Sequence, residues 1–180
     1  GVVTILQPKD NDILTGSVKV VALGPVNTRN MTFWLKNLTS GRLVPVYNDT
    51  LVEDGWNFTL DTTLREDGLW ELSVNATDDV GRYIDTAAAL NLRIDNVAPT
   101  AALQQPANGV IVRGAVIINV TASSDAKQVV FEYSNDSGTG WQPLGVDFSP
   151  SGGWTLAWYT PAVNDAATYR VRANVSDYAG

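Results

Sequence analysis

Apolar and polar residues alternate along most of the chain with a period of two. The side chains of a β-strand point to opposite faces in turn, so this period is typical of strands that are buried on one face. No segment of helical length carries apolar residues at the spacing of an amphipathic helix. The alternating sets occur in both halves of the chain: Val18, Val20 and Ala22; Met31, Phe33 and Leu35; Trp70, Leu72, Val74 and Ala76; Val116, Ile118 and Val120; Val129, Phe131 and Tyr133. The pattern therefore predicts an all-β protein.

The second half of the sequence repeats the first half at an offset of 98 residues, which becomes 99 after one inserted residue. The aligned pairs include Gln7-Pro8 with Gln105-Pro106, Phe33 with Phe131, Gly55-Trp56 with Gly153-Trp154, and Trp70 with Tyr169. A repeat of this length has the size of a small β-sandwich and is too long for a solenoid unit. We predict two tandem β-sandwiches, residues 1–98 and 99–180, joined by the proline-containing segment 95–100.

Three turn motifs lie near the end of the first repeat: Asp67-Gly68-Leu69-Trp70, Asp78-Asp79-Val80-Gly81 and Asp95-Asn96-Val97-Ala98-Pro99. They resemble the end of a prokaryotic Ig-like domain, in which such turns enter and leave the penultimate strand and lead to the next domain. The resemblance implies that both sandwiches are Ig-like or fibronectin III-like. These domains form arrays in bacterial and archaeal surface proteins, S-layer proteins and adhesins, so the resemblance implies an extracellular module at the cell surface. The second repeat departs from the family pattern at 164–169, where the glycine of the first turn is missing.

The strongest chemical signal is the N-glycosylation sequon, Asn-x-Ser/Thr with no proline in the middle. With 14 Asn and 27 Ser and Thr among 180 residues, chance placement predicts about two sequons, and eight are present. The acceptor residues are Asn30, Asn37, Asn48, Asn57, Asn75, Asn119, Asn135 and Asn174. Asn and Thr also suit turns and strand edges, which raises the chance count modestly. We predict covalent N-glycans at these eight positions.

The strand pattern also predicts the direction in which each acceptor points. Asn75 lies between Val74 and Ala76 and therefore on the face opposite to the apolar set. The same argument places four further acceptors outward, namely Asn30, Asn57, Asn119 and Asn174, whereas Asn37, Asn48 and Asn135 are predicted to lie in turns. Every acceptor is thus expected to face solvent, as a bulky glycan requires. An array of Ig-like domains with many N-glycans and no cysteine most closely resembles archaeal surface proteins.

Composition excludes several classes of function. The chain carries 12 Lys and Arg against 19 Asp and Glu, a net charge of −7, which argues against a nucleic-acid partner. It has no cysteine and no histidine, which removes disulfides, thiolate nucleophiles, His-based catalysis and His or Cys zinc sites. No apolar run is long enough for a membrane span, so we expect no membrane contact in this segment. The acidic pairs Glu53-Asp54, Glu66-Asp67 and Asp78-Asp79 lie in short turns, and we expect no enzymatic activity.

The two repeats differ at their ends. After Gly81 the first repeat continues with Leu90, Leu92 and Ile94 at alternate positions, which predicts a final strand with these side chains inward. Gly180, the counterpart of Gly81, is the last residue of the sequence. Because Gly1 is not a methionine, we expect a portion of a longer protein, and the missing strand then either follows in the natural chain or comes from a neighbouring subunit by strand complementation.

Two weaker sites remain as alternatives to purely structural roles. Asp95 and Asn96 supply oxygen ligands in the segment between the repeats, and a structural Ca²⁺ there is the one cofactor that we consider. Trp34 is predicted on the outward face with Asn30, and Trp141 lies in a glycine-rich turn, so both are candidate platforms for stacking on sugar rings. Trp56, Trp70 and Trp154 are assigned to the core.

Together these features favour a structural module of a surface-layer, sheath or filament protein, with N-glycans and further copies of the same assembly as partners. The alternative is a binding module, such as an adhesin stalk or a carbohydrate-binding region of a larger surface protein or enzyme.

Overall fold

The computed structural model describes residues 2–135, 138–165 and 168–180, and these form two compact units that meet between Val97 and Ala98. Strands make up almost all the regular structure, which confirms the predicted all-β fold. The described helical segments are three single turns of 3-10 helix: η1 (Val52–Asp54), η2 (Thr62–Leu64) and η3 (Thr160–Ala162). The described residues contain no helix that is long and apolar enough to cross a membrane.

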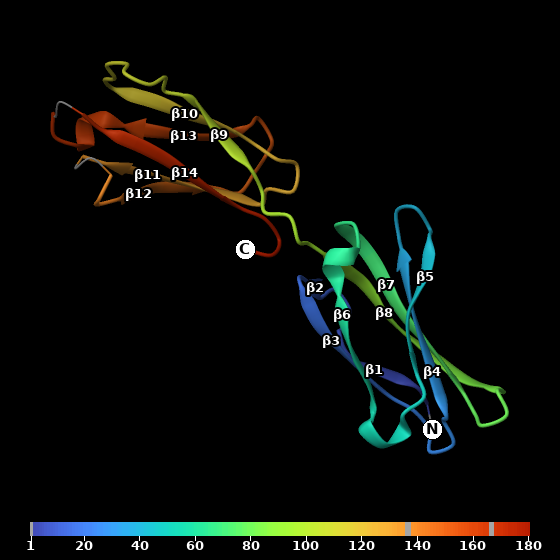
Figure 1. The fold of residues 1–180 in the computed structure, drawn as a ribbon. Helices are drawn as coiled ribbons and strands as arrows, with labels where there is room; N and C mark the ends of the chain where they lie inside the picture. Colours follow the sequence, from blue (N-terminus) through green and yellow to red (C-terminus); the bar gives the residue numbers. More distant parts are fainter. Residues whose placement is uncertain (1, 136–137, 166–167) are drawn as a thin grey trace. The chain divides into compact units, whose positions relative to one another are not determined.

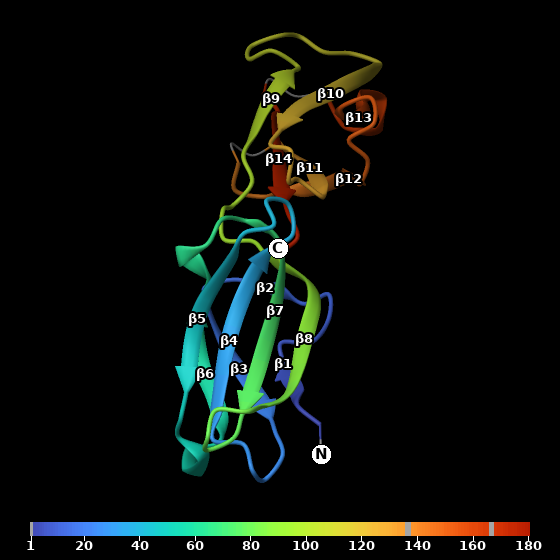
Figure 2. The same ribbon diagram turned by 90° about the vertical axis from the view of Figure 1, so that its right-hand side faces the viewer.

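The first unit is a sandwich of two sheets (Figure 1). The smaller sheet has the order β1-β3-β6, with strands β1 (Thr4–Gln7), β3 (Ser17–Leu23) and β6 (Trp56–Asp61). The larger sheet has the order β2-β8-β7-β4-β5, with strands β2 (Ile13–Leu14), β4 (Asn30–Asn37), β5 (Leu43–Asp49), β7 (Gly68–Thr77) and β8 (Tyr83–Ile94). Figure 2 shows β5, β4, β7 and β8 side by side in this order.

The second unit repeats this arrangement with fewer strands in the described residues. One sheet has the order β13-β10-β9, with strands β9 (Ala101–Gln105), β10 (Ala115–Ala122) and β13 (Trp154–Tyr159). The other has the order β12-β11-β14, with strands β11 (Gln128–Ser134), β12 (Gln142–Asp147) and β14 (Arg170–Ser176).

Strand register shows that the two units are structural repeats of one another. Phe33 on β4 pairs with Val74 on β7, and Phe131 on β11 pairs with Ala173 on β14, at the offsets found in the sequence. Both phenylalanines are fully buried at the centre of their units. The peptide bonds of Gln7-Pro8 and Gln105-Pro106 are both cis.

Each core is built from the inward set of the alternating pattern. In the first unit Met31, Phe33 and Leu35 of β4 lie beside Leu72 and Val74 of β7 and pack against the smaller sheet. The predicted core tryptophans are buried in both units: Trp56, Trp70 and Trp154. Since full burial of a large apolar side chain contributes roughly 1.5–3 kcal/mol, these layers supply the main stabilisation of a chain that has no disulfide.

The aromatic residues at the start of β7 and β14 have the same structural role. The indole N–H of Trp70 donates to the carbonyl of Glu66, 3.0 Å away. The hydroxyl of Tyr169 donates to the carbonyl of Asn164. Each ring therefore fixes the loop that precedes its strand, as a corner aromatic does in other sandwiches.

Strand β8 is present as predicted, but one of its three inward assignments is wrong. Leu92 and Ile94 are fully buried, whereas Leu90 is 44% exposed. The cause is a β-bulge: Leu92 pairs with Trp70 but Ala89 pairs with Leu72, so an extra residue shifts the alternation. Asn91 in the bulge has a φ of 54°. The inward positions before the bulge are therefore Ala87 and Ala89.

The position of the bulge predicts which side chains of β8 stabilise the first unit, and two substitutions test this. We expect Leu92→Ala to lower the free energy of unfolding of this unit by about 2–5 kcal/mol, because it leaves a cavity in the core. Leu90→Ala makes the same chemical change at an exposed position and should cost roughly 0.5 kcal/mol. Urea unfolding followed by NMR signals of residues 2–97 measures both. Equal losses in the two variants would contradict the described register.

Candidate functional site

The structure exposes most of the sequon asparagines to solvent. Asn48, Asn75, Asn135 and Asn174 are exposed, and Asn30, Asn57 and Asn119 are half-buried. Asp136 and Ser137, which complete the sequon of Asn135, lie outside the described residues. Asn48 lies within β5 rather than in a predicted turn, yet its side chain is exposed. The chain therefore offers acceptor amides on the outer faces of both units.

Asn37 is the exception, and the prediction that it faces solvent from a turn is wrong. Strand β4 runs as far as Asn37, so the inward series of Met31, Phe33 and Leu35 ends on this residue, which is only 6% exposed. Its carboxamide oxygen accepts hydrogen bonds of 2.9 Å from the backbone N–H groups of Thr39 and Ser40. Asn37 thus stabilises the turn that follows β4.

Three acceptors gather around Thr32 on the outer face of the larger sheet of the first unit, and we call Asn30, Asn48 and Asn75 the acceptor cluster. Thr32 pairs with Asn48 on β5 and with Asn75 on β7. Its hydroxyl lies 2.8 Å from the Asn48 carboxamide oxygen and 3.3 Å from that of Asn30. Because neighbouring strands are about 4.8 Å apart, Asn48 and Asn75 lie on the order of 10 Å from each other. Thr32 also supplies the hydroxyl of the Asn30 sequon.

Asn57 and Asn174 have side-chain amide groups that already donate hydrogen bonds. The amide nitrogen of Asn57 donates to the carbonyl of Asp54 at 2.9 Å, in the turn before β6. The amide nitrogen of Asn174 donates to the Glu132 carboxylate at 2.9 Å. Since a glycan is attached through this nitrogen, modification there must preserve or replace these contacts.

The two candidate sugar platforms, Trp34 and Trp141, lie in different units. A guanidinium group, that of Arg172, lies 4.2 Å from the centre of the Trp141 ring and covers one of its faces. Glu132 accepts a 2.6 Å charged hydrogen bond from the same arginine. Trp34 is half-buried in β4, and its indole N–H is shielded from solvent with no partner among the described residues. One face of the Trp141 ring is therefore covered, and only part of Trp34 is accessible to a sugar.

The segment between the repeats uses its oxygen atoms for internal hydrogen bonds. The Asn96 carboxamide oxygen accepts a 2.8 Å bond from the backbone N–H of Gly16. The Asp67 carboxylate accepts bonds of 2.9 and 3.0 Å from the backbone N–H groups of Asn96 and Val97. Asp95 is buried, and the described residues contain no group of three acidic side chains that could hold a metal ion. This geometry favours turn stabilisation and lends no support to the predicted Ca²⁺ site at Asp95 and Asn96.

Asp78 stabilises the turn between β7 and β8. Its carboxylate accepts hydrogen bonds from the backbone N–H groups of Arg82 (2.8 Å) and Val80 (3.1 Å). It also accepts a 2.8 Å bond from the guanidinium of Arg82. These contacts, the Arg82 backbone bond most of all, outweigh the opposing effect of burial and hold the pKa of Asp78 below its ordinary value.

Two further structural carboxylates, Asp49 and Asp147, were not predicted from the sequence. Asp49 is buried and accepts backbone hydrogen bonds of 3.0 and 3.2 Å from Leu51 and Asn57. Asp147, 98 residues later, accepts two equivalent bonds, each of 2.9 Å. The signal that would have revealed them is their alignment in the repeat.

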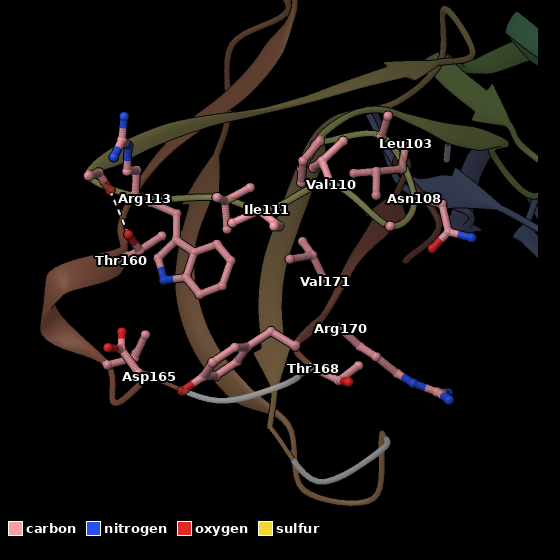
Figure 3. A pocket seen from close by; sticks show the side chains of 18 of the residues that line it. Leu103, Asn108, Val110, Ile111, Arg113, Thr160, Asp165, Thr168, Arg170 and Val171 are labelled. Carbon is pink, nitrogen blue, oxygen red and sulfur yellow. Dashed lines mark hydrogen bonds between the residues drawn. The ribbon is translucent and has the colours of Figure 1, made fainter.

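The second unit contains an open cavity of about 1050 Å³ between its two sheets. Apolar lining residues come from both sides of it, including Leu103, Val110, Val112, Trp158, Tyr169 and Val171. Figure 3 shows Val110, Ile111 and Val171 on the same open space, whereas Arg170 extends away from them. No motif in the sequence points to this cavity.

Comparison with known proteins identifies the fold. No protein-family model and no curated protein matches the chain. Domains A168–A170 of titin are similar in structure, with a TM-score of 0.56 and 10% identity over 99% of this chain and 61% of that chain. The fibronectin(III)-like modules of Clostridium thermocellum CbhA give a TM-score of 0.43 and 19% identity over 96% and 85% of the two chains. A tetra-tandem repeat from the extending region of a large adhesion protein gives 0.34 and 17% over 98% and 49%.

At 10% identity the similarity to the titin domains establishes the fold and nothing finer. The chain consists of tandem β-sandwiches of the fibronectin III and Ig-like type, as its alternating pattern and internal repeat predicted.

The Asp78 turn predicts a specific acid sensitivity. A carboxyl group with a lowered pKa in the folded state adds stability above its unfolded-state pKa of about 3.9, and this contribution disappears as the pH falls through the lower folded-state pKa. We expect Asp78→Asn to be less stable than the parent at pH 6 and the difference to shrink below about pH 4. Urea unfolding between pH 2 and 7 measures this convergence. A difference between Asp78→Asn and the parent that stays constant over this pH range would refute the assignment.

Proposed function

We propose that the chain is a structural module of an extracellular, N-glycosylated surface protein of the surface-layer, sheath or filament kind. The observation that carries the proposal is the acceptor cluster, in which three sequon asparagines surround Thr32 on one outer sheet face. Eight sequons occur where chance predicts about two, and seven of their asparagines are at least partly accessible. The similarity to archaeal surface proteins rests on the sequence motifs alone.

The different chemistry of the inner and outer faces of the sheets supports this proposal. The inner faces are apolar and hold the sandwich together without disulfides. The outer faces carry the acceptors, so that attached glycans add hydration and bulk without entering the core. A module of this kind acts by stiffness and by steric cover. We propose that it does so without catalysis, since the acidic pairs Glu53-Asp54, Glu66-Asp67 and Asp78-Asp79 lie in separate turns.

Mass spectrometry of material from a glycosylating host tests the proposal. Asn75→Gln and Thr77→Ala each break the same sequon, and each should reduce the intact mass by one glycan. Asn27→Gln, at an exposed asparagine outside any sequon, should leave the glycan mass unchanged. We also expect Asn37→Gln to leave it unchanged, because the buried Asn37 amide is not accessible to a transferase. Unmodified Asn30, Asn48 and Asn75 in native material would overturn the proposal.

A further inference from the structure

The outer face of the larger sheet in the first unit carries a large aromatic side chain beside the acceptor cluster. Strands β4, β7 and β8 lie side by side in this sheet (Figure 2). Trp34 belongs to the outward set of β4, is half-buried and pairs with Ser73 on β7. The next outward residue of β7 is Asn75, which is therefore a diagonal neighbour of Trp34. Side chains in such positions are about 7–8 Å apart, within reach of an aromatic ring.

Small residues occupy the sheet positions beside Trp34 on the β7 side. Ser73 is opposite Trp34, and the exposed Ala88 of β8 is opposite Ser73. These two side chains take up little volume above the sheet, so a ring attached to Asn75 can lie over them and against the indole. We call Trp34, Ser73 and Ala88 the outer shelf.

The equivalent face of the second unit is filled by charged side chains of its own. Glu132 stands at the position of Trp34. Arg172 stands at the position of Ser73, and its guanidinium donates to Glu132 at 2.6 Å. Glu132 also accepts from the amide nitrogen of the sequon residue Asn174 at 2.9 Å. Beside equivalent sequons, one repeat thus has an aromatic and a small residue, and the other has an ion pair that binds its own asparagine.

We propose that the outer shelf is a binding site for the first sugar ring of the glycan on Asn75. A pyranose ring has a face of C–H groups that packs on an indole, while its hydroxyl groups remain in water. The covalent bond to Asn75 makes this contact intramolecular, so that stacking too weak to hold a free sugar is still populated. The inference rests on the proposed function, because it requires a glycan on Asn75.

Asn75 is better placed for this contact than the other two members of the acceptor cluster. Asn48 approaches the indole from the β5 side, where the pyrrolidine ring of Pro45 pairs with Trp34 in place of a small side chain. Asn30 lies four residues from Trp34 along β4, about 13 Å at the rise of a strand. The sugar on Asn75 therefore has the shortest unobstructed approach to the ring.

The probe is a single N-acetylglucosamine on Asn75. A chain made in a glycosylating host and trimmed with an endoglycosidase carries one such ring at each occupied site. We expect nuclear Overhauser contacts between the Trp34 ring and the sugar on Asn75, and upfield shifts of its C–H protons caused by the indole ring current. Thr77→Ala, which removes this sugar and keeps Asn75, should abolish both signals.

Thermal unfolding of the first unit measures whether the contact stabilises the fold. The melting temperature should be about 4 °C higher with the Asn75 sugar than in Thr77→Ala. In Trp34→Leu, which keeps an apolar side chain but removes the ring, this difference should fall below about 1 °C. Because each difference is taken within one background, a loss of stability caused by Trp34→Leu itself cancels. Thr59→Ala removes the sugar of Asn57 on the other sheet and is the matched control, since its effect should be the same in both backgrounds.

A sugar attached by chemical synthesis separates this inference from the proposed function. The chain has no cysteine, so Asn75→Cys can be alkylated at a single position with an iodoacetamide derivative of N-acetylglucosamine. The attached ring should contact Trp34 whether or not a transferase modifies Asn75. The inference is overturned if the sugar at position 75 gives no contact with Trp34 in either preparation, or if Trp34→Leu leaves the temperature difference unchanged. Contacts of Trp34 with sugars on Asn30 or Asn48 instead would also overturn it.

Discussion

The burial of one face of the central strands is the constraint on which the rest of the molecule depends. With no cysteine to form disulfides, the units are held by sheet-to-sheet packing around residues such as Phe33 and Phe131. Where alternate side chains are buried, the side chains between them face water. Polar acceptor residues at those positions do not disturb the packing of the core. The same constraint means that a strand position without an occupant exposes both an apolar surface and a row of backbone groups.

The sequence predicted the architecture well because alternation is a global signal. A period of two repeated over several strands, and again 98 residues later, specifies fold class, repeat and the buried set with little ambiguity. The core positions of Phe33 and Phe131 follow from it directly.

The errors arose where a local feature interrupts or extends the alternation. A bulge at Asn91 shifts the phase of β8 and turns Leu90 outward, and a single inserted residue leaves little trace in an apolar pattern. At Asn37 the strand runs further than the apolar residues do, and a polar side chain occupies an inward position by bonding to the next turn.

Glycans on the outer sheet faces need not disturb the strands that carry them. Asn174 is part of β14, and its side chain stands on the outer sheet face beside Glu132. Asn75 is exposed in the first unit although β4 and β8 flank it on both edges. A glycan at such a position points away from the core and from the hydrogen bonds between strands, which run within the plane of the sheet. Sugar cover is therefore compatible with a fully paired sheet.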